Sequence, residues 1–277
     1  MPPRWVRTLQ SKANRAVDAA RLAAFRQEPV HPFHIVCATY NPSRWVLRHL
    51  DSIHDQRYPN ALVRHLVCND ASSDDTDALV RGWMAEHPSH RVRYEVNDER
   101  VGGCANLTRG FREAERGTIV LQVDGDDWLP DPGVLAYLDM LYRDPDLWMT
   151  YNTWALPDGT PGSHCGRLSR EVVRRNGVRD EPWKTSHLHS FRRELFDHVR
   201  DEDLKDPETG TYWTASVDMS HYMPMLELAG HHARHVDRIT YVYNLNPHSI
   251  IQSRRTYQLA CEARIRALPR YEPLRSL

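Results

Sequence analysis

A regular alternation of apolar runs with amphipathic segments between residues 33 and 123 constrains the fold of this chain more than any other feature. Strands are predicted at 33–41, 61–70, 91–96 and 117–123, and helices at 43–56, 72–87 and 104–116. Ser43 is the expected N-cap of the first helix. Strands that alternate with helices form parallel sheets joined by right-handed crossovers. The pattern therefore predicts an α/β fold with a doubly wound, mostly parallel sheet and helices on both of its faces.

Beyond residue 131 the alternation is less regular. The periodicity predicts a helix at 133–143, a strand at 147–154, a loop to about residue 166, a short helix at 190–199, a longer helix at 213–230 and a strand at 238–245. We therefore expect one domain with two halves, residues 29–130 and residues 131–277. Residues 1–28 precede it as a basic helical leader, with small apolar residues at helical spacing.

Two roles are open for the leader. A basic amphipathic helix can lie on a membrane surface or dock on a partner. Its apolar stripe is mostly alanine, which buries little area, so packing on the domain or on a second subunit of a dimer is the favoured alternative.

Composition excludes several protein classes. The chain has 277 residues and a net charge of −1, so it lacks the global positive charge of a nucleic-acid-binding protein. Its five cysteines are scattered without C-x-x-C spacing, which favours a reducing compartment. No apolar run reaches the ~18 residues of a membrane span, and no signal-peptide core is present. We expect a cytoplasmic protein, with peripheral membrane contact through the leader as the alternative.

Polar residues follow each predicted strand of the first half. They are Thr39, Tyr40, Asn41, Asn69, Asp70, Asn97 and the segment Asp124 to Asp127. In doubly wound sheets, ligands bind beyond the carboxyl ends of the strands. The sequence therefore predicts that one cleft collects these side chains.

The segment "GTIVLQVDGDDWLP" (117–130) places three carboxylates, Asp124, Asp126 and Asp127, directly after a buried strand. Carboxylates this close repel one another unless a cation or hydrogen-bond donors compensate them. Mg²⁺ or Mn²⁺ held by one or two carboxylates completes its shell with water and substrate phosphates, so the pattern predicts a phosphate-containing ligand. The alternative is a solvated acidic turn, with Asp127 or Asp131 capping the next helix.

The order of these motifs resembles the family 2 glycosyltransferases of the GT-A fold. The resemblance is carried by "IVCATYN", "SIHDQRY" and "NDASSDD", followed by "NDERVGGCANLTRGF" and "VDGDDW", and it covers about residues 33–130. The segments "TSHLHSFRRELFDHV" and "YWTASVDMSHYMPMLELAG" are similar, less tightly, to the acceptor side of one branch of that family.

The resemblance implies an inverting transfer of a sugar from a nucleotide-diphosphate donor, first of all a UDP-sugar, to a hydroxyl of a glycan or another acceptor. By position, the nucleotide would be held by Thr39, Tyr40, Asn41, Asp70, Asn106 and Asp124. The metal, Mn²⁺ or Mg²⁺, would be held by Asp124, Asp126, Asp127 and His248. Asp218 would be the general base, with Glu227 the next candidate.

Other interpretations stay open. A sugar-nucleotide-binding protein, a nucleotidyltransferase of similar fold, or a transferase acting on modified nucleic acid could share the acidic motif. His248 is either a metal ligand or a surface histidine. The cluster His231, His232 and His235 could bind zinc, but its spacing favours a solvated turn. Trp183, His187 and His189 line the pocket or belong to the core.

Overall fold

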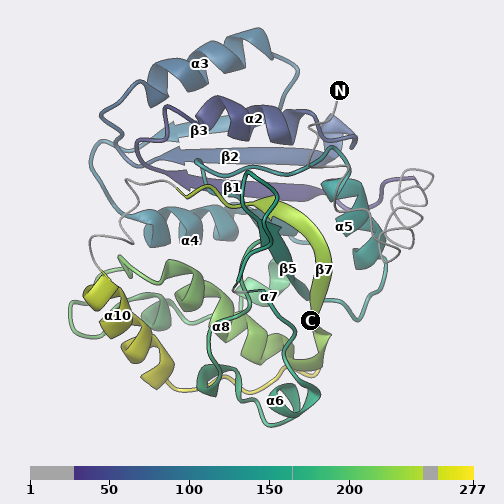
Figure 1. Cartoon of the computed structure of the whole chain (residues 1–277), viewed down its shortest axis with the longest axis vertical. Helices are drawn as coiled ribbons and strands as arrows, with labels where there is room; N and C mark the ends of the chain where they lie inside the picture. Colours follow the sequence, from purple (N-terminus) through teal and green to yellow (C-terminus); the bar gives the residue numbers. More distant parts are fainter. Residues whose placement is uncertain (1–27, 164, 246–254) are drawn as a thin grey trace.

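A seven-stranded sheet forms the centre of the molecule (Figure 1). The structure is a computed structural model and describes residues 28–163, 165–245 and 255–277. The strands lie in the order β3-β2-β1-β4-β6-β5-β7. Their bounds are Phe33–Thr39 (β1), Val63–Asn69 (β2), Val92–Val96 (β3), Ile119–Gln122 (β4), Met149–Ala155 (β5), His189–Arg192 (β6) and Ala233–Val242 (β7).

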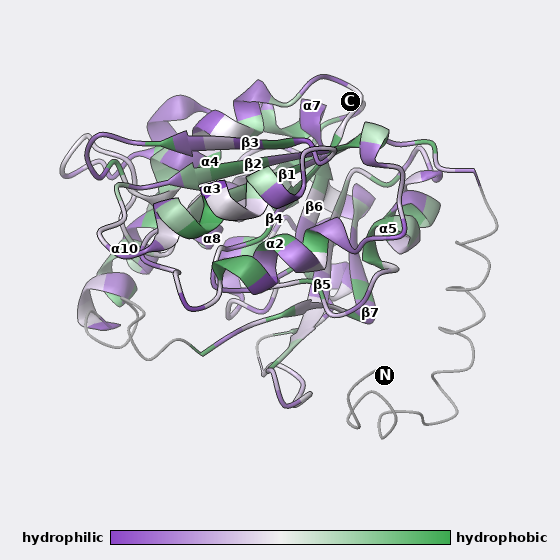
Figure 2. Cartoon of the chain, turned by 90° about the horizontal axis from the view of Figure 1, so that it is seen from above, coloured by the Kyte–Doolittle hydropathy of each residue, from purple (hydrophilic) through white to green (hydrophobic). Residues whose placement is uncertain are grey.

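The first four strands are parallel and confirm the predicted alternation. β1 pairs with β2 and β4, and β2 pairs with β3. The connecting helices are α2 (Val46–His54), α3 (Thr76–Glu86) and α4 (Gly103–Glu113). Side chains of β1 point alternately to the two faces, so Ile35 and Val36 belong to different apolar clusters. The α/β sheet with helices on both faces is confirmed, and Figure 2 shows its apolar strands enclosed between those helices.

Helices α2 and α3 lie on one face of the sheet, and α4 and α8 lie on the other (Figure 1). Ser43 does not cap α2, because the helix begins three residues later with Trp45 at the N-cap position. The Ser43 backbone N–H instead donates to Asp74 Oδ2 at 2.9 Å. The other helices are α5 (Val134–Tyr142), α6 (Arg170–Arg174), α7 (Arg193–Phe196), α8 (Val217–Ala229) and α10 (Arg255–Ala267).

The prediction of a helix over 190–199 is wrong for its first part. Residues His189–Arg192 form β6, which runs antiparallel between β4 and β5, and only Arg193–Phe196 are helical. Ser190 hydrogen-bonds Thr150 Oγ1 at 2.6 Å and Tyr142 Oη at 2.9 Å, which fixes the strand to its neighbours. Pairing with residues distant in the sequence overrides the local pattern.

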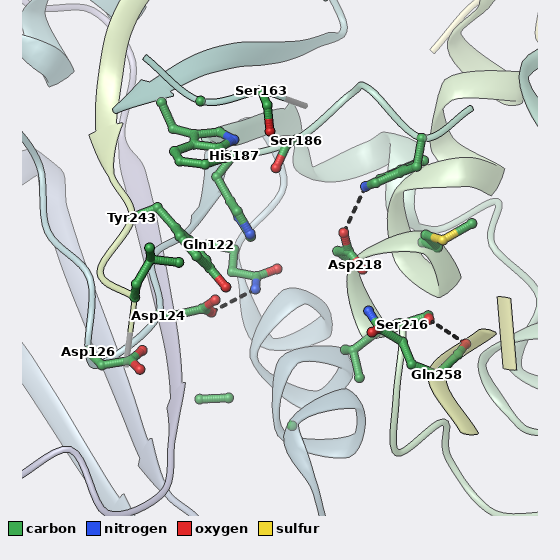
Figure 3. A pocket seen from close by; sticks show the side chains of 18 of the residues that line it. Gln122, Asp124, Asp126, Ser163, Ser186, His187, Ser216, Asp218, Tyr243 and Gln258 are labelled. Carbon is green, nitrogen blue, oxygen red and sulfur yellow. Dashed lines mark hydrogen bonds between the residues drawn. The ribbon is translucent and has the colours of Figure 1, made fainter. Parts of the chain in front are cut away.

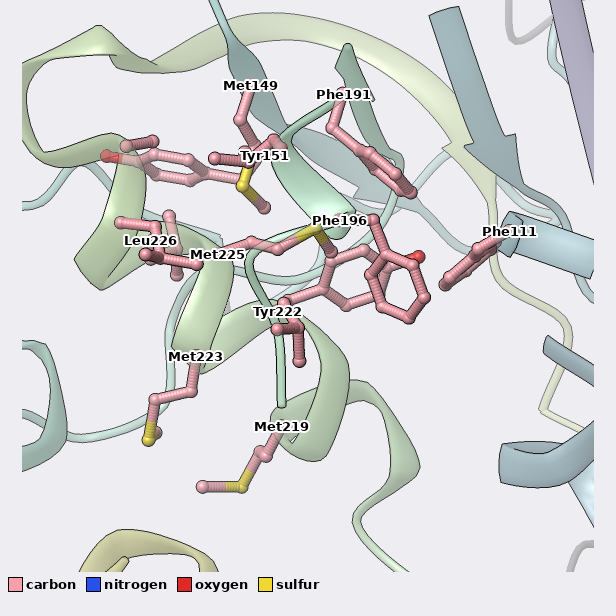
Figure 4. Packing of buried hydrophobic residues seen from close by; sticks show 14 of the residues in the cluster. Phe111, Met149, Tyr151, Phe191, Phe196, Met219, Tyr222, Met223, Met225 and Leu226 are labelled. Atoms are coloured by element: carbon pink, nitrogen blue, oxygen red, sulfur yellow. The ribbon is translucent and has the colours of Figure 1, made fainter. Parts of the chain in front are cut away.

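Helix α8 begins at Val217, four residues later than predicted. Ser216 has a φ of +52°, a left-handed conformation that interrupts a right-handed helix. The helix then crosses a core of aromatic and methionine side chains, including Phe111, Phe196 and Tyr222 (Figure 4). The first turn of α8 therefore lies between this core and the carboxyl ends of the strands.

Several predicted segments differ in extent or lie outside the described residues. β7 begins at Ala233, five residues before the predicted strand, and pairs in parallel with β5. Residues 1–27 of the predicted leader and His248 lie outside the described residues. None of the helices in the described ranges is both long and apolar enough to span a membrane.

Candidate functional site

A cleft of about 1070 Å³ lies at the carboxyl ends of β1 and β4 and extends to α8 and α10 (Figure 3). The residues of this cleft that the sequence singled out are Thr39, Tyr40, Asp124, Asp126, Trp183, His187 and Asp218. Asn41, Asp70, Asn106 and Asp127 do not line it. The structure thus brings Asp218 to the same cleft as the acidic motif, although the two are far apart in the chain.

The acidic motif presents two of its three carboxylates to the cleft (Figure 3). Gln122 Nε2 donates to Asp124 Oδ1 at 2.8 Å, and the Asp124 N–H donates to Tyr241 Oη at 3.2 Å. A Cβ at Gly125 would lie 2.2 Å from Thr39 Oγ1, so only glycine lets the turn lie this close to the end of β1.

Asp124 and Asp126 fit a divalent cation that shares its shell with phosphate. Hard cations such as Mg²⁺ take carboxylate oxygens and are commonly held by one or two protein carboxylates, with substrate phosphates and water completing the shell. In the described ranges no group of three or more His, Cys, Asp or Glu residues is arranged to hold a metal by itself. The donor set matches a cation that arrives with its phosphate ligand.

Asp127 does not occupy the position expected of a metal ligand. Its side chain is 1% exposed, and both oxygens accept hydrogen bonds at 2.7 Å, from Tyr241 Oη and from the Asn244 N–H. The end of β7 supplies these donors, because Val242 forms a bridge with Trp128. Burial, reinforced by Asp126 and Asp124, raises the pKa of Asp127 well above its usual value. In this geometry Asp127 fastens the acidic turn to β7.

Asp70 lies behind the cleft rather than on its surface. It is 2% exposed, and its carboxylate accepts hydrogen bonds from the Val101 and Gly102 N–H groups and from Asn97 and Asn106. Burial alone would raise its pKa, but these donors hold the pKa below its usual value. The predicted nucleotide residues Asp70 and Asn106 are therefore in contact, and they hold the segment before α4 in place.

Arg100 is a candidate that sequence reasoning missed. Its guanidinium carbon lies 3.7 Å from the ring centroid of Tyr40, and its Nε lies 3.6 Å from Asp70 Oδ2. Tyr40 is 40% exposed and lines the cleft. A positive charge stacked on this ring lies where an anionic ligand entering the cleft would meet it. The sequence signal that could have pointed to Arg100 is its position in "NDER", between two polar motifs.

Asp218 is the second residue of α8, and its side chain points into the cleft (Figure 3). Trp183 Nε1 donates to Asp218 Oδ2 at 2.9 Å. Burial raises the pKa of Asp218, while His187 and the hydrogen bonds from Met219 and Trp183 oppose that rise. A partly buried carboxylate with a raised pKa that still contacts a cleft is suited to accept a proton.

Glu227 is not accessible to the cleft. Its side chain is fully buried and pairs with the Arg179 guanidinium through two contacts of 2.6 and 2.9 Å. It also accepts the Tyr271 N–H at 3.2 Å. Glu227 is therefore a structural residue and is no alternative to Asp218.

The histidines separate into cleft and core residues. His187 lines the cleft and stacks on Tyr241, with ring centroids 4.9 Å apart. His189 is fully buried and stacks on Tyr222 at 3.6 Å. His232 stacks on Trp148 at 3.7 Å, and the cluster of three histidines around it is not arranged to hold a metal.

Comparison with known proteins places this cleft in context. The family model described as "Glycosyl transferase family 2" matches residues 34–200. The chondroitin synthase of Escherichia coli is 29% identical over 156 residues, which cover 53% of this chain and 21% of that protein. The hyaluronan synthase of Pasteurella multocida is 27% identical over 144 residues, 50% of this chain and 14% of that protein. The chain thus spans about a fifth or less of the length of these relatives.

Solved structures share the fold. The mannosyltransferase PcManGT from Pyrobaculum calidifontis, in complex with GDP-Man and Mn²⁺, has a TM-score of 0.59 and 22% identity, and the match covers 89% of this chain and 71% of that one. Residues 1–349 of S. aureus TarS, in complex with UDP-GlcNAc, have a TM-score of 0.59 and 18% identity, with 80% and 61% covered. The predicted GT-A fold is confirmed.

Proposed function

Because the chain belongs to glycosyl transferase family 2, we propose that it transfers a sugar from a nucleotide-diphosphate donor to an acceptor hydroxyl with inversion at the anomeric carbon. The observation that carries the proposal is the position of Asp218 in the same cleft as Asp124 and Asp126 (Figure 3). A proton acceptor and a metal-binding pair in one cleft are the two parts that such a displacement needs.

The donor side is assigned to Asp124 and Asp126. These residues would hold Mn²⁺ or Mg²⁺, and the bound cation would stabilise the negative charge of the departing diphosphate. The nucleotide is assigned to Thr39 and Tyr40, which line the cleft, and to Arg100, which stacks on Tyr40. UDP-sugars are the first donors to test, since S. aureus TarS was solved with UDP-GlcNAc, although PcManGT was solved with GDP-Man. His248 is a further proposed ligand outside the described residues.

The acceptor side is assigned to Asp218. Its carboxylate takes the proton of the acceptor hydroxyl while the acceptor oxygen bonds to the anomeric carbon and the bond to the diphosphate oxygen breaks. Trp154, Trp183 and Tyr243 line the cleft, and flat aromatic rings with polar tips suit a sugar ring. Chondroitin and hyaluronan synthases are the curated relatives, so a glycan is the acceptor we propose.

The donor assignment is tested by a thermal-shift screen of UDP- and GDP-sugars with and without Mn²⁺. A ligand that binds only the native state raises the unfolding temperature by mass action. We expect stabilisation that needs both sugar nucleotide and Mn²⁺, and its loss in Asp126→Ala with an unchanged baseline. Metal-dependent stabilisation that survives in Asp126→Ala would remove the metal assignment.

A further inference from the structure

Trp183 makes the one side-chain hydrogen bond that the structure gives to the carboxylate of Asp218 among the described residues. The indole Nε1 lies 2.9 Å from Asp218 Oδ2, and the indole ring lines the cleft. An indole N–H can only donate, so it favours the ionised carboxylate. The bond fixes Oδ2 of the carboxylate, and the Met219 N–H donates to the same carboxylate from the main chain of α8.

The main chain holds Trp183 in place. The neighbouring Lys184 carbonyl accepts the Gly166 N–H at 3.0 Å, and Thr185 forms a bridge with Cys165. Asp218 is fixed from the other side as the second residue of α8. The donor and the acceptor of this bond therefore come from two anchored segments, 35 residues apart in the sequence.

We propose that Trp183 is a positioning residue that orients the carboxylate of Asp218 and keeps it ionised, so that the carboxylate meets the acceptor hydroxyl. The inference rests on the proposed role of Asp218 as the base. Beyond that role, a neutral side chain, Trp183, controls both the orientation and the protonation state of the Asp218 carboxylate.

Several titratable groups lie around Asp218, and their charges also influence its titration. The cleft around it presents His187 before β6, Asp124 after β4, Tyr243 after β7, and Arg255 and Glu262 on α10. Tyr222, one turn further along α8, is buried in the core and interacts with Asp218 from there. Trp183→Phe changes none of these groups and keeps an aromatic ring in the cleft wall. A shift in the titration of Asp218 in this variant therefore reports the lost N–H.

The first measurement needs no substrate. Protein labelled with ¹³C at aspartate carboxyl carbons is titrated by NMR, and the Asp218 signal is assigned as the one missing in Asp218→Asn. Loss of a hydrogen bond to the charged form should raise the pKa of Asp218 by about one unit in Trp183→Phe. Trp154→Phe is the matched control, because Trp154 lines the same cleft and its Nε1 has no hydrogen-bond partner among the residues that the structure describes. It should leave the Asp218 titration in place.

The second measurement is turnover, followed as release of UDP or GDP from the sugar nucleotide found by the screen. In Trp183→Phe, kcat should fall about tenfold at pH 7, the acid limb of its pH profile should move up by about one unit, and the KM for the donor should stay within about twofold. In an Asp218→Asn background the same substitution should change kcat by less than about twofold, because the group it positions is already gone.

The two proposals fail separately. An unshifted Asp218 titration in folded Trp183→Phe overturns the positioning role, whatever Asp218 does in catalysis. Normal turnover in Asp218→Asn overturns the base. If Trp183→Phe does not fold, site-specific benzothienylalanine keeps the size of the indole and replaces only its N–H, and it should reproduce the same shift.

Discussion

At the scale of single residues, the carboxylates in and near the cleft form two groups that differ in their hydrogen-bond partners and in their access to the cleft. Asp127 and Glu227 are closed off by protein donors, whereas Asp124, Asp126 and Asp218 reach the cleft. Carboxylates that are fully hydrogen-bonded inside the protein contribute to its architecture. Those that keep contact with the cleft are the ones available to a metal or a proton.

Asp218→Asn tests the base directly. The amide keeps the size of the side chain but cannot take a proton at neutral pH, so turnover should fall by ~10²–10⁴, mostly in kcat. Nucleotide affinity should stay within about threefold, measured by calorimetry with Mn²⁺, because the donor contacts lie on other residues. Lower thermal stability with a moderate loss of both affinity and turnover would instead indicate a structural role.

Gly125→Ala tests the close packing of the acidic turn. The added methyl group would lie 2.2 Å from Thr39 Oγ1, so the turn must shift away from β1. We expect a loss of about 1–3 kcal/mol in the free energy of unfolding and a loss of Mn²⁺-dependent nucleotide binding. Gly82→Ala in α3 is the control, because its Cβ meets nothing within 4 Å. A helix-interior alanine there should stabilise the protein slightly. Intact nucleotide binding in Gly125→Ala would contradict the geometry.

At the scale of elements, α8 connects the two sides of the cleft. Asp218 lies in its first turn, and one turn later Tyr222 Oη donates to Gln122 Oε1 at 2.7 Å. Gln122 in turn donates to Asp124. The helix is also held at its far end, where Glu227 pairs with Arg179 next to the carbonyl of Ile265 in α10. The position of the proposed base relative to the acidic motif thus depends on one buried helix.

Glu227→Gln tests whether Glu227 contributes to the stability of the protein and not to its turnover. The substitution leaves the buried Arg179 guanidinium without its counter-charge, which should cost about 3–5 kcal/mol in urea unfolding. Turnover per folded molecule should change less than about threefold at a temperature where the variant is folded. A loss of kcat as large as that of Asp218→Asn, without destabilisation, would make Glu227 a catalytic candidate again.

At the scale of the whole molecule, the core contains histidines that are held neutral. Burial lowers the pKa of His34, His49 and His221 to about 4. His49 and His65 share a contact of 3.1 Å between their Nε2 atoms, which requires that one of them donate and one accept. Protonation of the accepting ring would remove this bond, and protonation of either ring would place a charge in the interior.

Acid should therefore unfold the protein through these histidines. Their folded pKa values of about 4 lie below the unfolded value of about 6.5, so the unfolded state binds more protons between these limits. Stability is fully present above pH 6.5 and is lost as the pH falls toward 4. The raised pKa values of Asp127 and Asp218 act in the opposite direction, but the histidines outnumber these two groups. Unfolding temperatures measured from pH 7 to 4.5 should fall steadily. A flat profile over this range would show that the histidines titrate normally in the folded protein.

The sequence alone determined the frame of the molecule. Strand and helix periodicities are local properties of the chain, so the alternation from β1 to β4 could be predicted without any tertiary contact. The convergence of Thr39, Asp124 and Asp126 on one edge followed from the rule that parallel strands end together. Asp218 could be singled out because it was an isolated carboxylate in an apolar helix that resembled an acceptor segment.

Tertiary structure decided the orientation and the protection of individual side chains. Asp127 faces inward because Tyr241, 114 residues later, supplies a donor. β6 is a strand because β4 and β5 lie on either side of it. Trp183 meets Asp218 across 35 residues. These outcomes depend on hydrogen bonds between residues that only the folded chain brings together, and no periodicity in the sequence encodes which partner will be nearest.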